Sequence, residues 1–229
     1  MGGTPMPRKM LKDLIVLGAS GNVWDVLDVV DAINALRPTW NVVGVLDDRR
    51  PVGSVFAGAK VVGTTREAAR FSDASFINAI RSEKTVSGME EILGATGVSD
   101  SQFATLVHPL ASVSSRAKVG RDVLVNFGAS VAGNVTIEDH VSLGPNAVVG
   151  HDTCVDRYSA VAAGAILSGG VQVERGCYIG TGATVKQQIR IGAGAIVGMG
   201  AVVTKDIEAG AVVVGNPARP MVRRARMIV

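Results

Sequence analysis

A repeat of six residues runs through the second half of this chain and restricts its fold more than any other feature. From Val107 to Val203, every sixth residue is Val, Ile or Leu, which makes 17 consecutive positions in a chain of 229 residues. Aliphatic residues scattered at random would not hold one position in six over that distance. The positions are Val107, Val113, Val119, Val125, Val131, Ile137, Leu143, Val149, Val155, Val161, Leu167, Val173, Ile179, Val185, Ile191, Val197 and Val203.

A second position of each unit is also restricted. Four residues after each aliphatic residue, from Ala111 to Ile207, the chain has only small or β-branched residues. Glycine often follows the aliphatic residue directly, as at Gly144, Gly150 and Gly180, where we expect it to form a left-handed or tight corner. One unit therefore predicts a short strand and a corner, and such units must stack because none buries its apolar side alone. The pattern predicts a parallel β-helix, whereas a β-sandwich would need alternation with a period of two.

The first hundred residues show a different pattern, in which short apolar runs alternate with helical spacing. Leu14–Leu17 predicts a strand that ends in a glycine turn, and the apolar spacing from Val23 to Leu36 predicts a helix that stops before Pro38. Further strands are predicted over Val42–Leu46 and Ala74–Ala79, with helical spacing again around Met89. This order is typical of a small Rossmann-like α/β domain with a parallel sheet. We expect three segments: an α/β domain over residues 1–103, a β-helix over 104–216 and a basic tail over 217–229.

The charge of the chain excludes an extended nucleic-acid surface. The net charge is +3, but four arginines lie in the last eleven residues, and the rest of the chain has 19 basic and 20 acidic residues. Aromatic residues make up only 4% of the chain, too few for a base-stacking platform. The basic end is therefore interpreted as a solvated tail near a phosphate-bearing ligand. Its arginines are Arg219, Arg223, Arg224 and Arg226.

The two cysteines and the hydropathy pattern indicate a cytoplasmic protein. Cys154 and Cys177 are too few for a disulfide framework and have no CxxC spacing, so we expect both to be small buried side chains. No apolar run is long enough to cross a bilayer, and the first ten residues have no signal-peptide core. We expect neither membrane insertion nor a bound metal.

Among the three histidines, His151 is the candidate for chemistry. His108 and His140 lie at corners, where a solvated or structural role is the usual one. His151 is the third residue of its unit, between Gly150 and Asp152, and Gly169 follows 18 residues later, the length of one β-helix coil. A backbone N–H at Gly169 would serve as an oxyanion donor beside the imidazole. Asp152 would orient His151, although adjacent side chains in an extended segment usually diverge.

Motifs along nearly the whole chain resemble the NeuD/PglD group of bacterial sugar acyltransferases. The motifs are GASGN at 18–22, Asp47-Asp48, VHP at 107–109, GHD at 150–152, LSGGV at 167–171 and VVGNPAR at 213–219. The resemblance implies a Rossmann-like domain that binds a sugar or nucleotide sugar and a left-handed β-helix that binds acetyl-coenzyme A. It also implies a homotrimer with active sites between subunits.

The resemblance assigns roles to the β-helix residues. His151 matches the histidine that takes a proton from the attacking amine or hydroxyl, Asp152 matches the acid beside it, and Gly169 matches the oxyanion contact. Thr181 and the corner at Gly198 and Met199 match coenzyme A contacts. The family has a second coenzyme-contacting histidine nine residues after the base, and Ala160 stands there in this chain.

Roles at the acceptor site follow in the same way. Ser20, Gly21 and Asn22 match the loop that touches the acceptor, and Asp47 and Asp48 match acids near the nucleotide base. The chain departs from the family at Asn22, where a histidine is common, and at Arg81, where a glycine near the nucleotide is often found. These departures leave the identity of the acceptor open.

The predicted activity is acetyl-CoA-dependent N-acetylation of a nucleotide-linked amino sugar for cell-surface glycan synthesis, by direct transfer without an acyl-enzyme. O-acetylation of sialic acid or another sugar is an alternative, because the same base serves a hydroxyl. A trimeric sugar-binding scaffold without catalysis is a third, since fold alone does not give function. The glycines at 18 and 21 also fit part of a dinucleotide-binding motif, but only a fragment of it.

Overall fold

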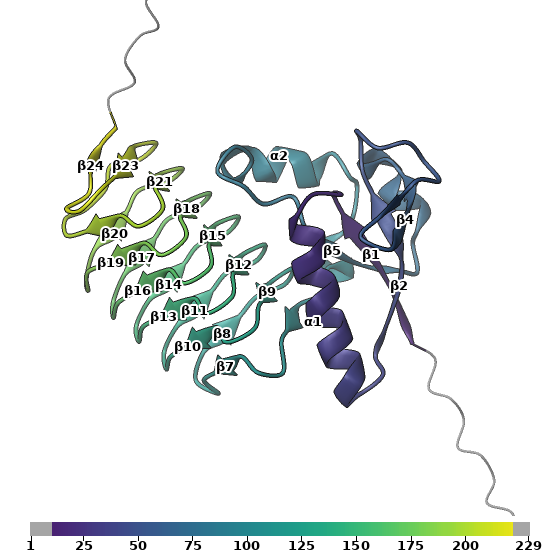
Figure 1. The fold of residues 1–229 in the computed structure, drawn as a ribbon, viewed down its shortest axis with the longest axis horizontal. Helices are drawn as coiled ribbons and strands as arrows, with labels where there is room; N and C mark the ends of the chain where they lie inside the picture. Colours follow the sequence, from purple (N-terminus) through teal and green to yellow (C-terminus); the bar gives the residue numbers. More distant parts are fainter. Residues whose placement is uncertain (1–10, 222–229) are drawn as a thin grey trace, which may run out of the picture.

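The computed structural model describes residues 11–221, which form an α/β domain joined to a long coiled prism (Figure 1). The α/β domain lies at one end of the prism, and the coils continue away from it toward the C-terminus. Among the described residues, no helix has the length and apolarity needed to cross a membrane.

A mostly parallel five-stranded sheet forms the centre of the α/β domain. Its order is β3-β4-β2-β1-β5, in which β4, β2, β1 and β5 run parallel and β3 pairs antiparallel with β4. The sequence pattern predicted β1, β2 and β5 but missed the β3–β4 hairpin, whose two short strands have no clear apolar run. The strands are β1 Lys12–Leu17, β2 Trp40–Leu46, β3 Val55–Phe56, β4 Ala59–Gly63 and β5 Ser75–Asn78.

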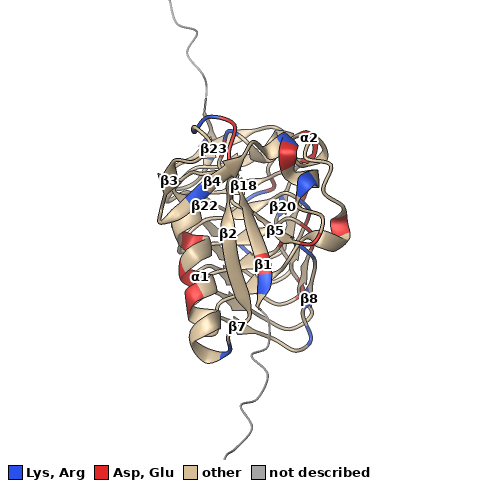
Figure 2. Cartoon of the chain, turned by 90° about the vertical axis from the view of Figure 1, so that its right-hand side faces the viewer, with Lys and Arg blue, Asp and Glu red and all other residues tan. Residues whose placement is uncertain are grey.

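Both faces of this sheet are covered, which explains why β1 is a continuous apolar run. Leu14 and Val16 pack in one core with α1 (Asn22–Leu36), and Ile15 and Leu17 pack in a second core with α2 (Met89–Gly94). In Figure 2, α1 and α2 lie on opposite sides of β1 and β2. A parallel sheet with helices on both faces is the Rossmann-like arrangement predicted from the sequence. Three short 3₁₀ helices complete the domain: Thr65–Arg70, Val86–Gly88 and Asp100–Gln102.

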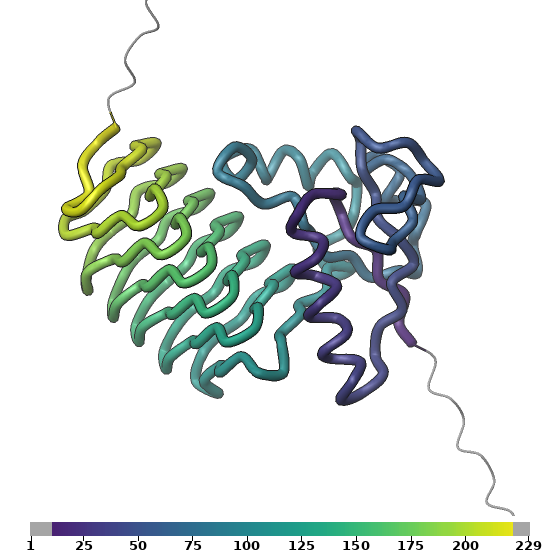
Figure 3. The backbone as a smooth tube through the Cα atoms, in the orientation of Figure 1, coloured from purple at the N-terminus to yellow at the C-terminus, as the bar shows by residue number. Residues whose placement is uncertain are grey.

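The prism confirms the six-residue repeat at every position. Each of the 17 aliphatic residues is the second residue of a two-residue strand, from Val107 in β6 to Val203 in β22. Strands 18 residues apart pair in parallel, as Val131 does with Val149, so three units make one coil of a left-handed β-helix. Figure 3 shows these coils as a stack of nearly identical loops. The aliphatic side chains fill the interior and form one continuous core.

Three flat faces result from this pairing. The first face contains β6 Leu106–Val107, β9 Leu124–Val125, β12 Ser142–Leu143, β15 Ala160–Val161, β18 Tyr178–Ile179, β21 Ile196–Val197, β23 Val212–Val214 and β24 Arg219–Pro220. The second contains β7 Ser112–Val113, β10 Ser130–Val131, β13 Val148–Val149, β16 Ile166–Leu167, β19 Thr184–Val185 and β22 Val202–Val203. The third contains β8 Lys118–Val119, β11 Thr136–Ile137, β14 Cys154–Val155, β17 Gln172–Val173 and β20 Arg190–Ile191.

The outward residue of each strand gives the faces different surfaces. On the first face, Leu106 and Leu124 are buried in the α1 core, so this face holds the α/β domain. The second face presents small and aliphatic side chains, with Val148 and Ile166 both exposed. The third face presents mainly polar and charged ones. The second face therefore exposes aliphatic side chains that the α/β domain does not cover.

The glycines after the aliphatic residues have a different role from the one expected. Residues with positive φ lie three positions after the aliphatic residue, as at Asp152 and Gly164. Gly144, Gly150 and Gly180 are not among them. A Cβ at these three sites would stand 2.7, 2.7 and 2.6 Å from a backbone nitrogen of the next coil. Glycine is therefore required there for close approach between coils, and the prediction of left-handed corners at these glycines is wrong.

The C-terminal end also differs from the sequence expectation. The repeat shortens, because Val197 pairs with Val213, and β24 then pairs antiparallel with β23. Arg219 therefore lies in a hairpin rather than in a free tail. Arg223, Arg224 and Arg226 lie outside the described residues.

The two cysteines differ in burial. Cys177 is fully buried, and burial raises the pKa of its thiol to about 11. Cys154 is only partly buried, because it is the outward residue of β14. The expectation of two buried thiols is correct for Cys177 alone.

Candidate functional site

His151 lies at the corner where the second face of the prism turns into the third. Its side chain is 73% exposed in the single chain, and its Nδ1 lies 2.7 Å from Oδ2 of Asp152. We expected adjacent side chains to diverge, but Asp152 has a φ of +60°. This left-handed backbone turns the carboxylate back toward the imidazole, so the geometric expectation was wrong and the pair is formed.

The Asp152 carboxylate has a second partner that the sequence did not reveal. Asn134, in the preceding coil, donates from Nδ2 to Oδ1 of Asp152 at 2.6 Å. Hydrogen bonds from Asn134 and His151 lower the pKa of Asp152, so the carboxylate stays ionised and accepts a hydrogen bond from Nδ1–H of His151. The opposite ring nitrogen, Nε2, is then the unprotonated one and is able to accept a proton.

Gly169 lies directly against the His151 ring, as the 18-residue spacing predicted. A Cβ at Gly169 would stand 2.6 Å from Cε1 and 2.7 Å from Nε2 of His151, so only glycine fits. Within residues 11–221, the Gly169 N–H has no hydrogen-bond acceptor. The corner thus combines an oriented imidazole with a free backbone donor, which are the two groups that acyl transfer needs.

An open cavity of about 590 Å³ surrounds this corner. Polar and glycine residues of three successive coils make up its walls, so it has no apolar wall that would hold a ligand by itself. They are His151, Asp152, Ser168, Gly169, Gly170, Gln187 and Gln188.

The predicted coenzyme contacts lie on a different edge of the prism. Thr181 and Met199 occupy the same position in successive coils, at the corner between the first and second faces, and Met199 is 81% exposed. Gly198 precedes Met199, and a Cβ there would stand 2.7 Å from Cγ1 of Val214. Ala160 faces outward from β15 on the first face but is almost fully buried. Within one chain, Thr181, Gly198 and Met199 therefore lie at one edge of the second face and His151 at the other, whereas Ala160 lies on the first face.

The predicted acceptor residues come together in one cavity at the C-terminal edge of the α/β sheet. This cavity, here called the acceptor cavity, has a volume of about 850 Å³. Its walls include the glycine loop, which enters α1 with a φ of +90° at Gly18. All six predicted acceptor residues line it: Ser20, Gly21, Asn22, Asp47, Asp48 and Arg81.

The two aspartates of this cavity also hold its loops in place. Asp47 accepts the backbone N–H of Ala19 at 2.8 Å and those of Arg49 and Arg50 at 2.9 Å. Asp48 accepts from both the backbone and the hydroxyl of Thr65. Each carboxylate therefore joins two loops that follow different strands of the sheet.

Arg81 points its guanidinium into the junction between the two domains. Nη2 donates to the carbonyl oxygen of Asp122 at 2.9 Å and lies 3.4 Å from Oδ2 of the same residue. Burial lowers the pKa of Arg81, and the Asp122 carboxylate opposes that shift. Asn22 completes the link by donating to the carbonyl oxygens of Arg81 at 2.7 Å and Ala79 at 3.0 Å.

His140 has the structural role expected of a corner histidine. Its Nδ1 lies 2.9 Å from Oδ2 of Asp122, and its ring stacks on Tyr158. Asp122, His140 and Tyr158 follow one another at intervals of 18 residues, all with positive φ. The column they form packs against Phe103 of the α/β domain.

His108 is likewise structural, because its Nδ1 accepts the backbone N–H of Leu110 at 3.0 Å. Among the described residues, no group of three or more His, Cys, Asp or Glu side chains is arranged to hold a metal ion.

Comparison with known proteins gives one family and several close structures. The family model described as bacterial transferase hexapeptide (six repeats) matches residues 116–151. The acetyltransferase domain of PglB from Neisseria gonorrhoeae is 32% identical, with a TM-score of 0.79 over 92% of this chain and 100% of that one. It has also been solved with acetyl coenzyme A. Among curated proteins, none matches this chain.

Two further structures have the same fold over nearly the whole chain. PerB from Caulobacter crescentus, solved with CoA and GDP-perosamine, is 26% identical with a TM-score of 0.78, covering 93% of this chain and 98% of that one. WeeI from Acinetobacter baumannii is 29% identical with a TM-score of 0.78, covering 92% of this chain and 100% of that one.

Proposed function

Because this chain belongs to the sugar acetyltransferases of the hexapeptide-repeat superfamily, we propose that it acetylates an amino group on a nucleotide-linked sugar, with acetyl-CoA as donor. The observation that carries the proposal is the His151 corner, where an imidazole bonded to Asp152 stands against the free N–H of Gly169. In this proposal, residues 1–103 bind the acceptor and residues 104–216 carry the transfer.

The geometry accounts for each step of a direct transfer. The acceptor nitrogen attacks the thioester carbonyl while Nε2 of His151 takes its proton, and Asp152 stabilises the resulting imidazolium. The Gly169 N–H donates to the oxygen that becomes negative in the tetrahedral intermediate. When the C–S bond breaks, the proton passes from His151 to the sulfur of coenzyme A, so the products are the amide and the free thiol.

An acyl-enzyme route has little support from the cysteines. Burial raises the pKa of both thiols, that of Cys177 to about 11, which disfavours the thiolate needed for attack. Cys154 also lies on the third face, with its side chain outside the His151 cavity. Direct transfer from acetyl-CoA to the acceptor needs neither thiol.

The acceptor cavity supports a nucleotide-linked acceptor. Its volume of about 850 Å³ is in the range of cofactor-sized ligands, and the glycine loop at the start of α1 favours phosphate. The related PerB structure contains GDP-perosamine, an amino sugar joined to a nucleoside diphosphate. An acetyl-CoA-dependent step of this kind belongs in the cytoplasm, before the sugar enters a cell-surface glycan.

A homotrimer would bring the separated groups together. His151 lies at one edge of the second face, and Thr181, Gly198 and Met199, which are assigned to the coenzyme, lie at the other, so one chain holds only part of each site. That face exposes Val148 and Ile166, and association around a threefold axis would cover it. The His151 edge of one chain would then meet the Thr181 edge and the acceptor domain of the next.

Incubation with acetyl-CoA and a panel of acceptors, followed by mass spectrometry, tests this function. The panel contains UDP-, GDP- and dTDP-linked 3- and 4-amino sugars beside free sugars, including sialic acid. We expect a mass gain of one acetyl group only on a nucleotide-linked amino sugar. Acetylation of a free sugar hydroxyl alone would refute the amine assignment, and no acetylation with sugar binding retained would support a non-catalytic scaffold.

A further inference from the structure

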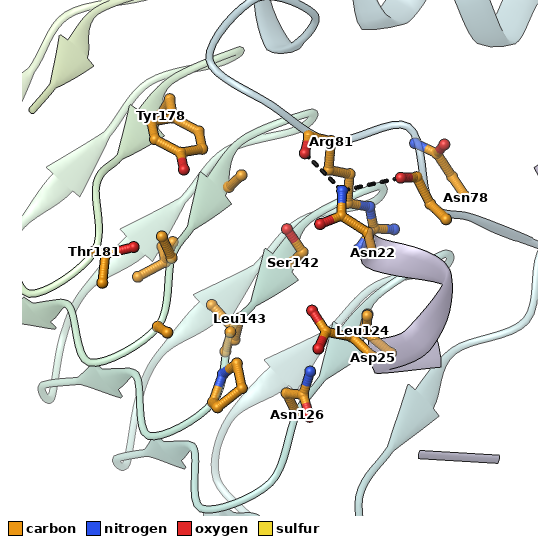
Figure 4. A pocket seen from close by; sticks show the side chains of 17 residues that line it. Asn22, Asp25, Asn78, Arg81, Leu124, Asn126, Ser142, Leu143, Tyr178 and Thr181 are labelled. Atoms are coloured by element: carbon orange, nitrogen blue, oxygen red, sulfur yellow. Dashed lines mark hydrogen bonds between the residues drawn. The ribbon is translucent and has the colours of Figure 1, made fainter. Parts of the chain in front are cut away.

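A second cavity lies beside the acceptor cavity, between α1 and the first face of the prism (Figure 4). We call it the interdomain cleft. Its volume is about 210 Å³, and it shares Asn22 and Arg81 with the acceptor cavity. The first turn of α1 forms one wall, and outward residues of β9, β12, β15 and β18 form the opposite wall.

Two buried hydrogen-bond donors that line this cleft have no partner among the described residues. Asn126 is 4% exposed, and its Oδ1 accepts the backbone N–H of Phe127, but its Nδ2 bonds to nothing. The Arg81 side chain is 6% exposed, and its Nε is also unpaired. Unpaired buried donors cost stability, so each is a feature that needs an explanation.

A carboxylate without a partner faces the same space. Asp25, in the first turn of α1, makes no hydrogen bond or ion pair within residues 11–221. Partial burial, followed by repulsion from Asp28, raises its pKa, which shows that nothing nearby compensates its charge. Figure 4 shows its carboxylate directed from α1 toward the side of the cleft that holds Asn126 and Ser142.

We infer that Asp25, Asn126 and Arg81 form the subsite that takes the sugar ring of the acceptor. Asp25 accepts an O–H or N–H bond from the ring, and the Asn126 and Arg81 nitrogens donate to ring or hydroxyl oxygens. The inference rests on the proposed function, which it deepens by naming residues that choose the sugar. None of these three groups takes part in proton transfer.

The sizes of the two cavities favour this division. The acceptor cavity is about four times larger than the cleft and suits the nucleotide, whereas about 210 Å³ suits one small ring. Unpaired donors and an unpaired acceptor in one small space match a carbohydrate, which carries both kinds of group on every face. Such a site rejects analogues that lack a bonded hydroxyl or amine, because the protein group is then left unpaired.

The first test compares Asp25→Asn and Asn126→Ser with the wild-type protein. Asp25→Asn keeps the shape of the side chain and removes its charge, and Asp31→Asn on the exposed part of the same helix is the matched control. We expect kcat/KM for the acceptor to fall about 10- to 100-fold in both cleft variants and to stay unchanged in the control. KM for acetyl-CoA should change less than kcat/KM for the acceptor, although Ala160 and Thr181, which are assigned to the coenzyme, line the same cleft.

The second test measures binding by calorimetry without acetyl-CoA. The ligands are the nucleotide-linked sugar, its nucleotide diphosphate alone, and an analogue lacking the sugar's amino group or one hydroxyl. We expect Asp25→Asn to bind the nucleotide diphosphate like the wild type, to bind the full acceptor more weakly and to discriminate less against one of the analogues. The analogue for which discrimination is lost identifies the group that Asp25 binds.

The outcomes separate this inference from the proposed function. If the wild type acetylates a nucleotide-linked sugar and Asp25→Asn retains its kcat/KM and selectivity, the subsite is refuted and the function stands. Equal loss of nucleotide binding, or a lowered melting temperature, would show that Asp25 is merely structural and would also refute the subsite. If the wild type acetylates nothing and the sugar adds nothing to nucleotide affinity, both are refuted.

Discussion

The His151 corner and the interdomain cleft are built from opposite kinds of contact. At the corner, Asp152 and Gly169 contact His151, and Asn134 bonds to Asp152, because each lies within one coil of its partner in the sequence. At the cleft, Asp25, Arg81 and Asn126 belong to a helix, a loop and a strand end of two different domains. The corner is a property of the repeat, whereas the cleft exists only because the α/β domain docks on the prism.

Under the proposed function, this difference separates catalysis at the corner from the choice of acceptor at the cleft. A repeat that stacks every 18 residues holds an imidazole and a backbone N–H at fixed distance, which suits a step common to many acceptors. The lining of a cleft between domains changes when any residue on either wall is substituted, which suits selection of one acceptor. Changes at the corner should therefore lower turnover for every acceptor, and changes at the cleft should alter which acceptor is used.

The largest effect is expected from His151→Ala. Loss of a positioned general base should lower turnover about 10²- to 10⁴-fold without changing the melting temperature, because the side chain is 73% exposed. Steady-state kinetics with a saturating acceptor measures the effect, and His108→Ala is the control at another corner. Turnover close to that of the wild type would show that another group is the base.

Ile166→Arg should break the trimer and so separate the His151 corner of one chain from the interdomain cleft of its neighbour. Arginine on the exposed second face places a charge where the subunits are proposed to meet. We expect the mass from light scattering to fall from trimer to monomer and transfer activity to be lost. Gln172→Arg, on the third face of the same coil, should remain trimeric and active. A wild-type protein that is a monomer at micromolar concentration would refute the trimer.

Asp122→Ala should weaken the docking that creates the cleft. Asp122 is fully buried and bonds to Arg81, His140 and the backbone N–H of Asn78. Removing it leaves the Arg81 charge buried without its partner, which costs about 3–5 kcal/mol of stability. Urea unfolding measures this loss. An unchanged unfolding midpoint would mean that the domains dock independently of this network.

Gly169→Ala should disturb the corner alone. The added Cβ would meet the His151 ring at 2.6 Å, so the ring must move, and a displacement of about 1 Å costs roughly 10²-fold in turnover. Gly133→Ala is a matched control, because Gly133 occupies the same corner position one coil before His151 and has room for a Cβ. Equal turnover in the two variants would contradict the proposed contact between Gly169 and the base.

The smallest effect concerns pH and Asp25. Its pKa is raised in the folded chain, so the folded state binds this proton more tightly than the unfolded state. Stability from this group is therefore present at low pH and is lost as pH rises from about 4, the ordinary pKa of aspartate, through the raised value. The melting temperature of Asp25→Asn should therefore rise slightly relative to that of the wild type as the pH passes through that interval. If the relative melting temperature of Asp25→Asn rose at low pH instead, the pKa of Asp25 would be lowered, not raised, in the folded chain.

Sequence alone determined the prism and most of the His151 corner. A strict six-residue period admits one way of stacking, so residues 18 apart must meet, and Gly169 was placed against His151 on that ground. Asp152 was expected to orient His151, but an extended backbone would have turned the two side chains apart, and their hydrogen bond depends on the left-handed backbone at Asp152. The close approach of Gly150 to the next coil was likewise not visible in the period.

Only the tertiary structure decided how the two domains cooperate. The contact between Arg81 and Asp122 spans 41 residues, and Asp25 and Asn126, which lie further apart still, line one cleft. No local propensity or period relates such positions, since their proximity follows from burial of Leu106 and Leu124 against α1. The repeat fixes contacts between residues one coil apart because each coil pairs with the next. The cleft depends instead on how the surface of the α/β domain fits the surface of the prism, and the two have unrelated sequence patterns.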